Sequence, residues 1–228
     1  MTEPTHTNRL LSRMTADDRN AVLAIATTQD FVLGDTICAP GEPLTHLHFV
    51  NSGIISVVTE MSDGRSVESF MIGLEGVAGS GASAVPADCH GRQLAQVAGS
   101  SMRVASDRFR NLAEDRPGVR SALARYVSEL QAELEQSTGC NALHGSAQRL
   151  AKWLLRCHDR VEGDVIHLTQ EYLATMLGAQ RTTVNEAAQS LQTAGAIRYS
   201  RGKLTVLDRD RLERSACECY QVTKVGPN

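Results

Sequence analysis

The sequence predicts an α+β chain built from an N-terminal antiparallel β-roll, one long helix and a C-terminal winged helix-turn-helix. Three observations support this. Between residues 29 and 107, short apolar runs alternate with turn residues about every eight to twelve positions. A helical apolar stripe follows in 115–143, and 168–207 holds two short helical patterns followed by a hairpin pattern. The predicted parts are 1–114, 115–143 and 144–228.

Two short helices are expected between Asn8 and Ala26, with a break at Thr15. The roll then follows, and Asp63-Gly64 between two apolar runs is a strong hairpin signal. Further turns are predicted at Asn51–Gly53 and Ala98–Ser100. Regularly spaced short strands of this kind indicate an antiparallel barrel or roll. The expected strands are His46–Val50, Ile54–Met61, Ser66–Ile72, Gln93–Ala98 and Met102–Ala105.

The long helix is expected to begin at Asp115, as N-cap, with Pro117 in the first turn. An apolar stripe can serve as core contact or as a pairing seam. A length of about 20 residues or more, about 30 Å, favours pairing into a dimer. A hinge is predicted at His144–Gly145, with Ser146 capping the next helix. The stripe consists of Val119, Leu123, Tyr126, Val127, Leu130 and Leu134.

The stretch from Leu168 to Leu207 has the pattern of a helix-turn-helix. Thr169 is a plausible N-cap of the first helix, and Gly178 follows its last apolar residue, where a left-handed residue often ends a helix. A second helix begins at Arg181. In a helix-turn-helix, the N-terminal residues of the second helix enter the DNA major groove. The alternative is a helical hairpin with an ordinary solvated face. The outer face of the second helix holds Arg181, Thr182, Asn185, Glu186 and Gln189.

A basic hairpin follows the second helix. One strand is expected over Ala196–Tyr199, a turn over Ser200–Lys203 and a returning strand over Leu204–Leu207. A basic hairpin directly after a recognition helix has the character of a wing that contacts phosphates. This favours the DNA-binding interpretation over the plain helical hairpin.

The motif LTQ-x-x-LA-x-x-LG-x-x-R-x-TV, followed by L-x-x-x-G-x-I-x-Y-S-R-G-x-L-x-V-L-D, resembles the cyclic-AMP receptor protein / fumarate-nitrate regulator (CRP/FNR) superfamily of bacterial transcription factors. In the roll, P-G-E, F-V-x-S-G-x-I-S and D-G-R recur at intervals similar to those of the family. The resemblance implies a cyclic-nucleotide-binding-like roll, a homodimer through the long helix, double-stranded DNA as partner and contact with RNA polymerase.

Side chains on the second helix are the expected base readers. Arg181 matches the family's guanine-reading arginine and suits a bidentate contact to guanine O6 and N7. Thr182 departs from the family's base-reading glutamate. Glu186 replaces a base-reading arginine, so it would accept a hydrogen bond from a cytosine amine. Asn185 and Gln189 reach either bases or solvent.

Other residues are expected at the DNA backbone. Thr183 matches a phosphate-contacting threonine of the family. Such contacts contribute affinity and salt dependence more than sequence choice. Two copies on a dimer imply a palindromic operator with half-sites about 34 Å apart. The other backbone candidates are Thr169, Gln170, Arg201 and Lys203.

The effector site departs from that of the cyclic-AMP binders, which carry Gly-Glu and then Arg-Ser/Thr-Ala. Here the matching residues are Gly76-Val77, followed by Arg92-Gln93, so the acceptor for the ribose and the hydroxyl for the phosphate are missing. We therefore predict no tight cyclic-AMP binding, and the roll holds another small molecule or none. By resemblance to the family's effector site, the candidate effector-binding residues of this chain are Glu75, Gly76, Arg92, Gln93 and Leu134.

No cofactor or metal is predicted from the six cysteines. The first 37 residues contain no cysteine, which excludes the family's iron–sulfur pattern. Cys217-x-Cys219 could ligate a metal or form a redox pair, but two thiols without further ligands make a poor site. Cys89-His90 falls where a haem-containing relative places its iron ligands, and an exposed loop is the simpler interpretation. His46 and His48 share one face of a strand and are expected to be surface or half-buried polar residues.

Charge and hydropathy agree with a cytoplasmic regulator. The chain carries net −3, yet residues 146–228 hold 12 Lys/Arg against 9 Asp/Glu, a net of +3. No apolar run is long enough to span a membrane.

We see no catalytic constellation and predict no enzyme. Two rivals are a constitutive DNA binder whose roll is only a dimerisation scaffold, and a nucleotide-binding regulatory subunit acting on a protein partner.

Overall fold

The computed structural model describes residues 8–223, and the chain divides into two compact units. The first comprises Met1–Thr59 and Phe70–Gln131, and the second comprises Glu60–Ser69 and Ala132–Asn228. The division falls within helix α4 (Pro117–Leu143), on the N-terminal side of the predicted hinge. Within residues 8–223, no helix combines the length and the apolar character that crossing a membrane requires.

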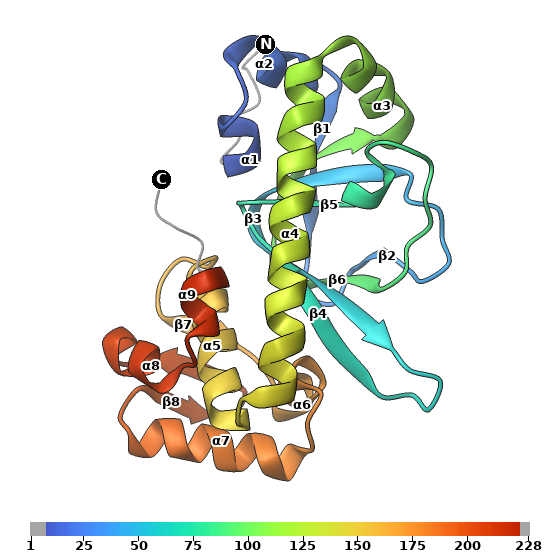
Figure 1. Cartoon of the computed structure of the whole chain (residues 1–228). Helices are drawn as coiled ribbons and strands as arrows, with labels where there is room; N and C mark the ends of the chain where they lie inside the picture. The colour runs from blue at the N-terminus through green and yellow to red at the C-terminus, as the bar shows by residue number, and fades with distance from the viewer. Residues whose placement is uncertain (1–7, 224–228) are drawn as a thin grey trace. The chain divides into compact units, whose positions relative to one another are not determined.

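The predicted antiparallel sheet is present and folds into a roll (Figure 1). Most of it belongs to the first unit, and its hairpin segment Glu60–Ser69 belongs to the second. The strand order of the sheet is β1-β6-β3-β4, with β2 pairing β6 and β5 pairing β3. A 3₁₀ turn, η1 (Ser80–Ala82), follows β5. The strands are β1 (Ala26–Phe31), β2 (Thr36–Cys38), β3 (His46–Glu60), β4 (Ser66–Ile72), β5 (Val77–Ala78) and β6 (Arg92–Ala105).

Two predicted turns are wrong, because β3 and β6 each run without interruption where two strands were expected. Gly53 and Gly99 mark the place where the backbones of these paired strands approach most closely. A Cβ on Gly99 would lie 2.0 Å from Ser52 O, and one on Gly53 would lie 2.5 Å from Val97 O. The pairing register shifts at this point, as in a β-bulge. The glycines therefore serve a bend within the sheet. The Asp63-Gly64 hairpin is confirmed, with Gly64 N donating to Met61 O at 3.0 Å.

The helices of the first unit include one that the sequence reading missed. Helices α1 (Arg9–Ser12) and α2 (Ala16–Ala24) are as expected, and the Thr15 side chain accepts from Asp18 N. The missed helix is α3 (Ser106–Asp115). Asp115 ends this helix and does not cap the long one. Arg116 is extended at φ −125° and ψ 90°, as the residue before a proline tends to be, and α4 begins at Pro117.

Half of the predicted dimer stripe is buried in the first unit's own core. Val119, Leu123 and Tyr126 have exposed fractions of 0%, 3% and 8% and pack in one cluster with Phe49 and Phe109. These three residues therefore do not form an open seam, because the roll and α3 supply their partners. Farther along α4, Val127 is 41% exposed, and Leu130 and Leu134 are half-buried.

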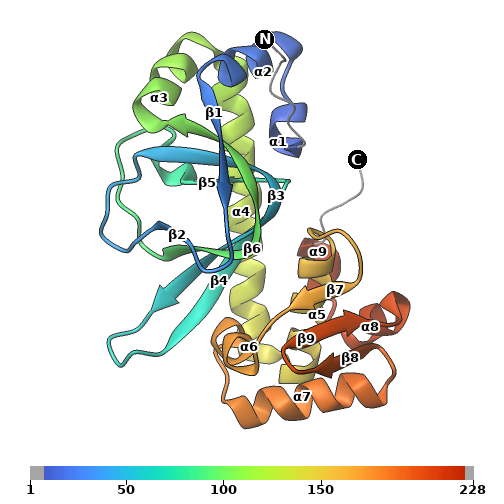
Figure 2. The ribbon, with the colours of Figure 1, turned by 180° about the vertical axis from the view of Figure 1, so that it is seen from behind.

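The second unit contains α5 (Ser146–His158), the helix pair α6 (Gln170–Leu177) and α7 (Arg181–Thr193), and a sheet of strand order β7-β9-β8 (Figure 2). The strands are β7 (Val165–His167), β8 (Ile197–Ser200) and β9 (Lys203–Val206). Two short helices follow, α8 (Arg209–Ser215) and α9 (Cys219–Thr223), because Ala216 adopts extended dihedrals between them.

Candidate nucleic-acid interface

Helix α6 is bounded by the two residues that the sequence indicates. The Thr169 hydroxyl accepts from Tyr172 N at 3.1 Å, which caps the N-terminus. Gly178 ends the helix in the left-handed region at φ +58°. Leu173, Met176 and Leu177 are buried. The first helix of the pair is therefore anchored at both ends and along its inner face, which sets the position of the helix that follows.

Helix α7 separates an apolar inner face from a polar outer face. Val184, Ala187, Ala188 and Leu191 are all buried. The helix begins at Arg181, as predicted, and its N-terminal end carries the partial positive charge of the helix dipole. Thr183 is half-buried. The predicted base readers Arg181, Thr182, Asn185, Glu186 and Gln189 are all exposed.

Arg181 is held by a residue that the sequence reading did not single out. Its Nη2 lies 2.9 Å from Oε1 of Glu171, in the first turn of α6, and the two side chains are 62% and 75% exposed. Their separation of ten positions across the turn matches no helical pair spacing, so only the packing of α6 on α7 brings them together. An exposed pair of this kind is weak and opens readily.

The wing is a two-residue hairpin between β8 and β9. Ser200 pairs with Lys203, and Arg201 and Gly202 have φ values of +50° and +74°. Two successive positive φ values are typical of a type I′ turn, whose twist matches that of the flanking strands. Arg201 is the only non-glycine residue with positive φ within residues 8–223. This turn presents its basic side chain at the tip.

Tyr199 joins the wing to α7 and to the segment that leads into α6. Its backbone N–H donates to Gln192 Oε1 of α7 at 2.9 Å, and its hydroxyl donates to Leu168 O at 3.0 Å. The wing is therefore positioned relative to α7. The predicted backbone-contacting residues Thr169, Gln170, Arg201 and Lys203 are all exposed, so each is free to meet a phosphate from its own element.

The predicted effector residues differ in their local surroundings. Gly76 lies against Tyr126, since a Cβ there would be 2.5 Å from the Tyr126 hydroxyl. Glu75 Oε1 accepts from the backbone of Gly73 at 3.1 Å. Arg92 and Gln93 are neighbours on β6, so their side chains point to opposite faces. Leu134 belongs to the second unit.

A polar cavity of about 180 Å³ in the first unit contains Gln93 together with His46, His48 and Arg103. The Arg103 guanidinium lies 3.2 Å from His46 Nδ1. Burial, reinforced by the charge of Arg103, lowers the pKa of His48 to about 4. Although the two histidines share a face, the adjacent guanidinium repels a cation, so they make a poor metal pair.

Cys89 and His90 point in different directions. Cys89 is buried, and its thiol donates to Gly91 O at 2.9 Å, whereas His90 is exposed. Cys38 lies beside Cys89, and burial together with a hydrogen bond that the Cys38 thiol donates to Cys89 raises the pKa of the Cys38 thiol to about 12. This arrangement fits the interpretation of an exposed loop histidine beside a structural thiol.

Comparison with known proteins assigns the interface to a family. The model of the Crp-like helix-turn-helix domain matches residues 148–215. The CRP-like cAMP-activated global transcriptional regulator of Mycobacterium tuberculosis is 29% identical over 196 residues, covering 82% of this chain and 87% of that protein.

Two solved structures show the same fold over most of the chain. FixK2 from Bradyrhizobium japonicum aligns with a TM-score of 0.72 at 20% identity, covering 85% of this chain and 98% of the other. The c-di-GMP responsive regulator CLP from Xanthomonas campestris aligns with a TM-score of 0.68 at 17% identity, covering 84% and 99%. Together with the capped α6, the exposed outer face of α7 and the basic wing, the match to the domain model shows that residues 148–215 form a Crp-like helix-turn-helix DNA-binding domain. The chain is a transcription regulator that is similar over most of its length to CRP-like regulators.

Proposed function

We propose that the chain acts as a homodimer on a palindromic operator, with α7 of each copy in the major groove. The observation that carries the proposal is the exposed face of α7, with Arg181 in its first turn and the wing attached through Tyr199. An arginine at this end of a recognition helix suits the O6 and N7 acceptors of guanine. Arg201 and Lys203 then contact the neighbouring phosphates.

The proposed dimer pairs along the exposed part of the α4 stripe. Val127 is 41% exposed, and Leu130 and Leu134 continue the same spacing along the helix. An exposed apolar side chain on a long helix is covered at low cost by the same helix of a second copy. Two copies related by a twofold axis then read two inverted half-sites.

We also propose that operator binding does not require cyclic AMP. The M. tuberculosis relative is named as cAMP-activated and the X. campestris regulator as c-di-GMP responsive, so the shared fold does not specify the ligand. Val77 stands where the cyclic-AMP binders carry the ribose acceptor, and it is fully buried in the apolar core. An aliphatic side chain cannot accept the hydrogen bond of a ribose hydroxyl.

Selection of bound sequences from a random DNA pool tests the proposal, using the full chain at physiological salt without a ligand. We expect an inverted repeat with a fixed guanine in each half-site and centres about 34 Å apart. The Arg181→Ala variant is expected to lose the preference for that guanine. Arg214→Ala removes the same charge from an exposed position of α8 and is expected to select the wild-type sequence.

Three outcomes would contradict parts of the proposal. Enrichment of a single half-site would overturn the dimer. Enrichment only after cyclic AMP is added would overturn independence from that ligand. A failure to enrich any sequence, with or without cell extract as a source of effectors, would overturn sequence-specific binding.

A further inference from the structure

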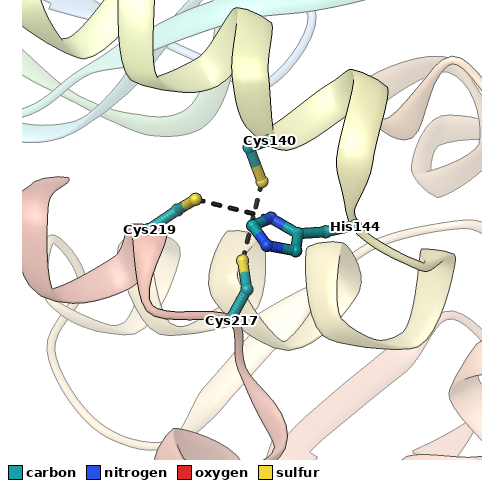
Figure 3. Close-up of side chains that lie close together, drawn as sticks. All are labelled: Cys140, His144, Cys217 and Cys219. Carbon is teal, nitrogen blue, oxygen red and sulfur yellow. Dashed lines mark hydrogen bonds between the residues drawn. The ribbon is translucent and has the colours of Figure 1, made fainter.

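Four metal-ligating side chains converge within the second unit, although they come from two distant stretches of the sequence. Cys140 lies in the last turn of α4 and His144 directly follows that helix, while Cys217 and Cys219 flank the bend between α8 and α9 (Figure 3). Their ligand atoms all lie within 4.8 Å of one another. From these residues we infer a tetrahedral zinc site with three thiolate ligands and one imidazole ligand.

The spacing of the ligand atoms suits one zinc ion. Cys140 Sγ lies 3.6 Å from Cys217 Sγ, and Cys219 Sγ lies 3.5 Å from His144 Nδ1. Zn–S bonds of about 2.3 Å in tetrahedral geometry place two sulfurs about 3.7 Å apart. Three cysteines and a histidine are a usual ligand set for structural zinc, and a site with four protein ligands leaves no open position for catalysis.

Local structure brings each ligand pair together. His144 follows Cys140 by four positions and continues the helical hydrogen bonding of α4, because its N–H donates to Cys140 O at 3.1 Å. Both side chains therefore share one face of the helix. At the other pair, Ala216 is extended after α8, and α9 begins at Cys219. Cys217 and Cys219 consequently lie on the two sides of a short bend.

The bend carrying the second pair is fixed by contacts outside the cluster. The Tyr220 hydroxyl lies 3.0 Å from Asp159 Oδ2, and Arg209 Nη2 lies 2.6 Å from Asp159 Oδ1. Tyr220 is 1% exposed, and it follows Cys219 directly. The ligands are thus held close together by the fold itself, which lowers the ordering cost of binding a metal.

The imidazole has the hydrogen-bonded orientation typical of a metal ligand. His144 Nε2 lies 3.2 Å from Oε1 of Glu218, while Nδ1 lies 3.5 Å from the Cys219 sulfur. A histidine that ligates a metal usually donates its other ring N–H to a carboxylate, which fixes the tautomer and the ring orientation. Glu218 lies between the two cysteines in the sequence, so the same segment supplies two ligands and the partner of a third.

The charges around the sulfurs also suit zinc. Three thiolates, a neutral imidazole and Zn²⁺ together carry one negative charge, while Cys140, Cys217 and Cys219 have exposed fractions of 0%, 3% and 1%. Lys152 of α5 is itself only 7% exposed, and its ammonium interacts with Cys140. A buried charge needs such a partner. Gln136 adds a hydrogen bond from Nε2 to Cys219 Sγ at 3.0 Å.

Bound zinc would join the end of α4 to the C-terminal segment next to Gly145. On binding, each thiol loses its proton to solvent and the metal replaces it as the partner of the sulfur. Four bonds to one ion would then link segments that lie more than 70 positions apart along the chain, as the separation of 77 between Cys140 and Cys217 shows. The site is therefore expected to stabilise α9 and the last turns of α4.

The test begins with the full chain purified under reducing conditions from zinc-supplemented cells. Elemental analysis is expected to find one zinc per chain, and cobalt substitution is expected to give the absorption bands of tetrahedral thiolate-bound Co²⁺. Cys217→Ala is expected to abolish stoichiometric zinc. Cys157→Ala is the matched control, because Cys157 is also a buried cysteine of the same unit but lies outside the cluster, and it should retain zinc.

A milder variant covers the case in which Cys217→Ala fails to fold. Glu218→Gln changes a side chain that is 77% exposed, and it should weaken zinc affinity about tenfold in a chelator competition. Hydrogen exchange after chelation is expected to rise in residues 136–144 and 216–223 and to stay unchanged in β3 and β6.

Four results would overturn the inference. The reduced wild-type protein could take up neither zinc nor cobalt, or Cys217→Ala could keep its full zinc content. The purified protein could instead contain stoichiometric iron with the visible absorption of a cluster, or Cys140 and Cys217 could form a disulfide while zinc is available.

Discussion

Glu171 and Arg181 form an ion pair across the turn of the helix-turn-helix, with Oε1 and Nη2 separated by 2.9 Å. The arginine proposed to read guanine is thus already engaged by a carboxylate of the preceding helix. Both side chains are more than half exposed. The ion pair orients the guanidinium of Arg181. The pair must open when Arg181 contacts DNA, and opening an exposed pair costs little free energy.

Replacing Glu171 should therefore strengthen DNA binding. In Glu171→Gln the competing carboxylate is lost, and an exposed ion pair contributes at most about 1 kcal/mol, so affinity is expected to rise by up to about fivefold. Fluorescence anisotropy with the selected operator measures this. Glu162→Gln removes an equal charge from an exposed turn of the same unit, and a similar gain there would point to a general charge effect.

Variants of a base-contacting residue and of a phosphate-contacting residue should differ in how their DNA affinity depends on salt concentration. Arg181→Ala is expected to cost about 1–3 kcal/mol on the operator and to relax the choice of guanine. Lys203→Ala is expected to weaken binding to all sequences alike and to lower the slope of log K against log salt by about one. Titrations at several salt concentrations on operator and random DNA measure both. An unchanged slope in Lys203→Ala would place that residue away from phosphate.

The tip of the wing offers a variant in which stability and DNA binding diverge. Arg201 has φ +50°, a conformation that asparagine adopts more readily than arginine. Arg201→Asn should keep or slightly raise the melting temperature while weakening DNA binding, because a phosphate contact is lost. Thermal unfolding and anisotropy on the same preparation show whether the effects separate. A clear fall in melting temperature would mean that the arginine side chain stabilises the hairpin.

Acid should destabilise the first unit through His48. Its pKa is about 4 in the folded chain, against an ordinary value of 6.5. Below pH 6.5 the unfolded chain takes up the proton first, so stability falls with decreasing pH until the folded pKa is reached. Such a difference corresponds to about 3 kcal/mol.

Hydrogen exchange of peptides from β3 and β6 as a function of pH measures this loss. His48→Gln removes the titrating group and is expected to flatten the dependence between about pH 6.5 and 4. His90→Gln, at an exposed loop position of the same unit, is expected to retain it. Equal dependence in His48→Gln and the wild type would assign the acid sensitivity to other groups.

The sequence predicted the DNA-binding part of the fold closely because its signals are local. Thr169 caps α6, Gly178 ends it and α7 begins at Arg181, all as expected. Capping, helical periodicity and turn preferences act over a few residues. The outer face of α7 follows from the spacing of its apolar residues alone.

The sequence was less informative wherever a residue's role depends on a distant strand or helix. Gly53 and Gly99 look like turn residues in the sequence, yet they lie inside two long paired strands whose backbones approach closely there. The stripe from Val119 to Leu134 was expected to pair with a second copy. Its first half is buried in the chain's own core, because a helical stripe looks the same whichever surface covers it.

The candidate zinc site shows most clearly the difference between what local sequence predicts and what depends on the packing of distant segments. Cys217-x-Cys219 looks like an incomplete pair in the sequence, and Cys140 with His144 has no metal motif of recognised spacing. Local sequence was sufficient to define the recognition helix and the wing, because the interactions that shape them lie within a few residues. The convergence of four ligands, and the pairing of Glu171 with Arg181, required the packing of segments far apart in the chain, which no local pattern records.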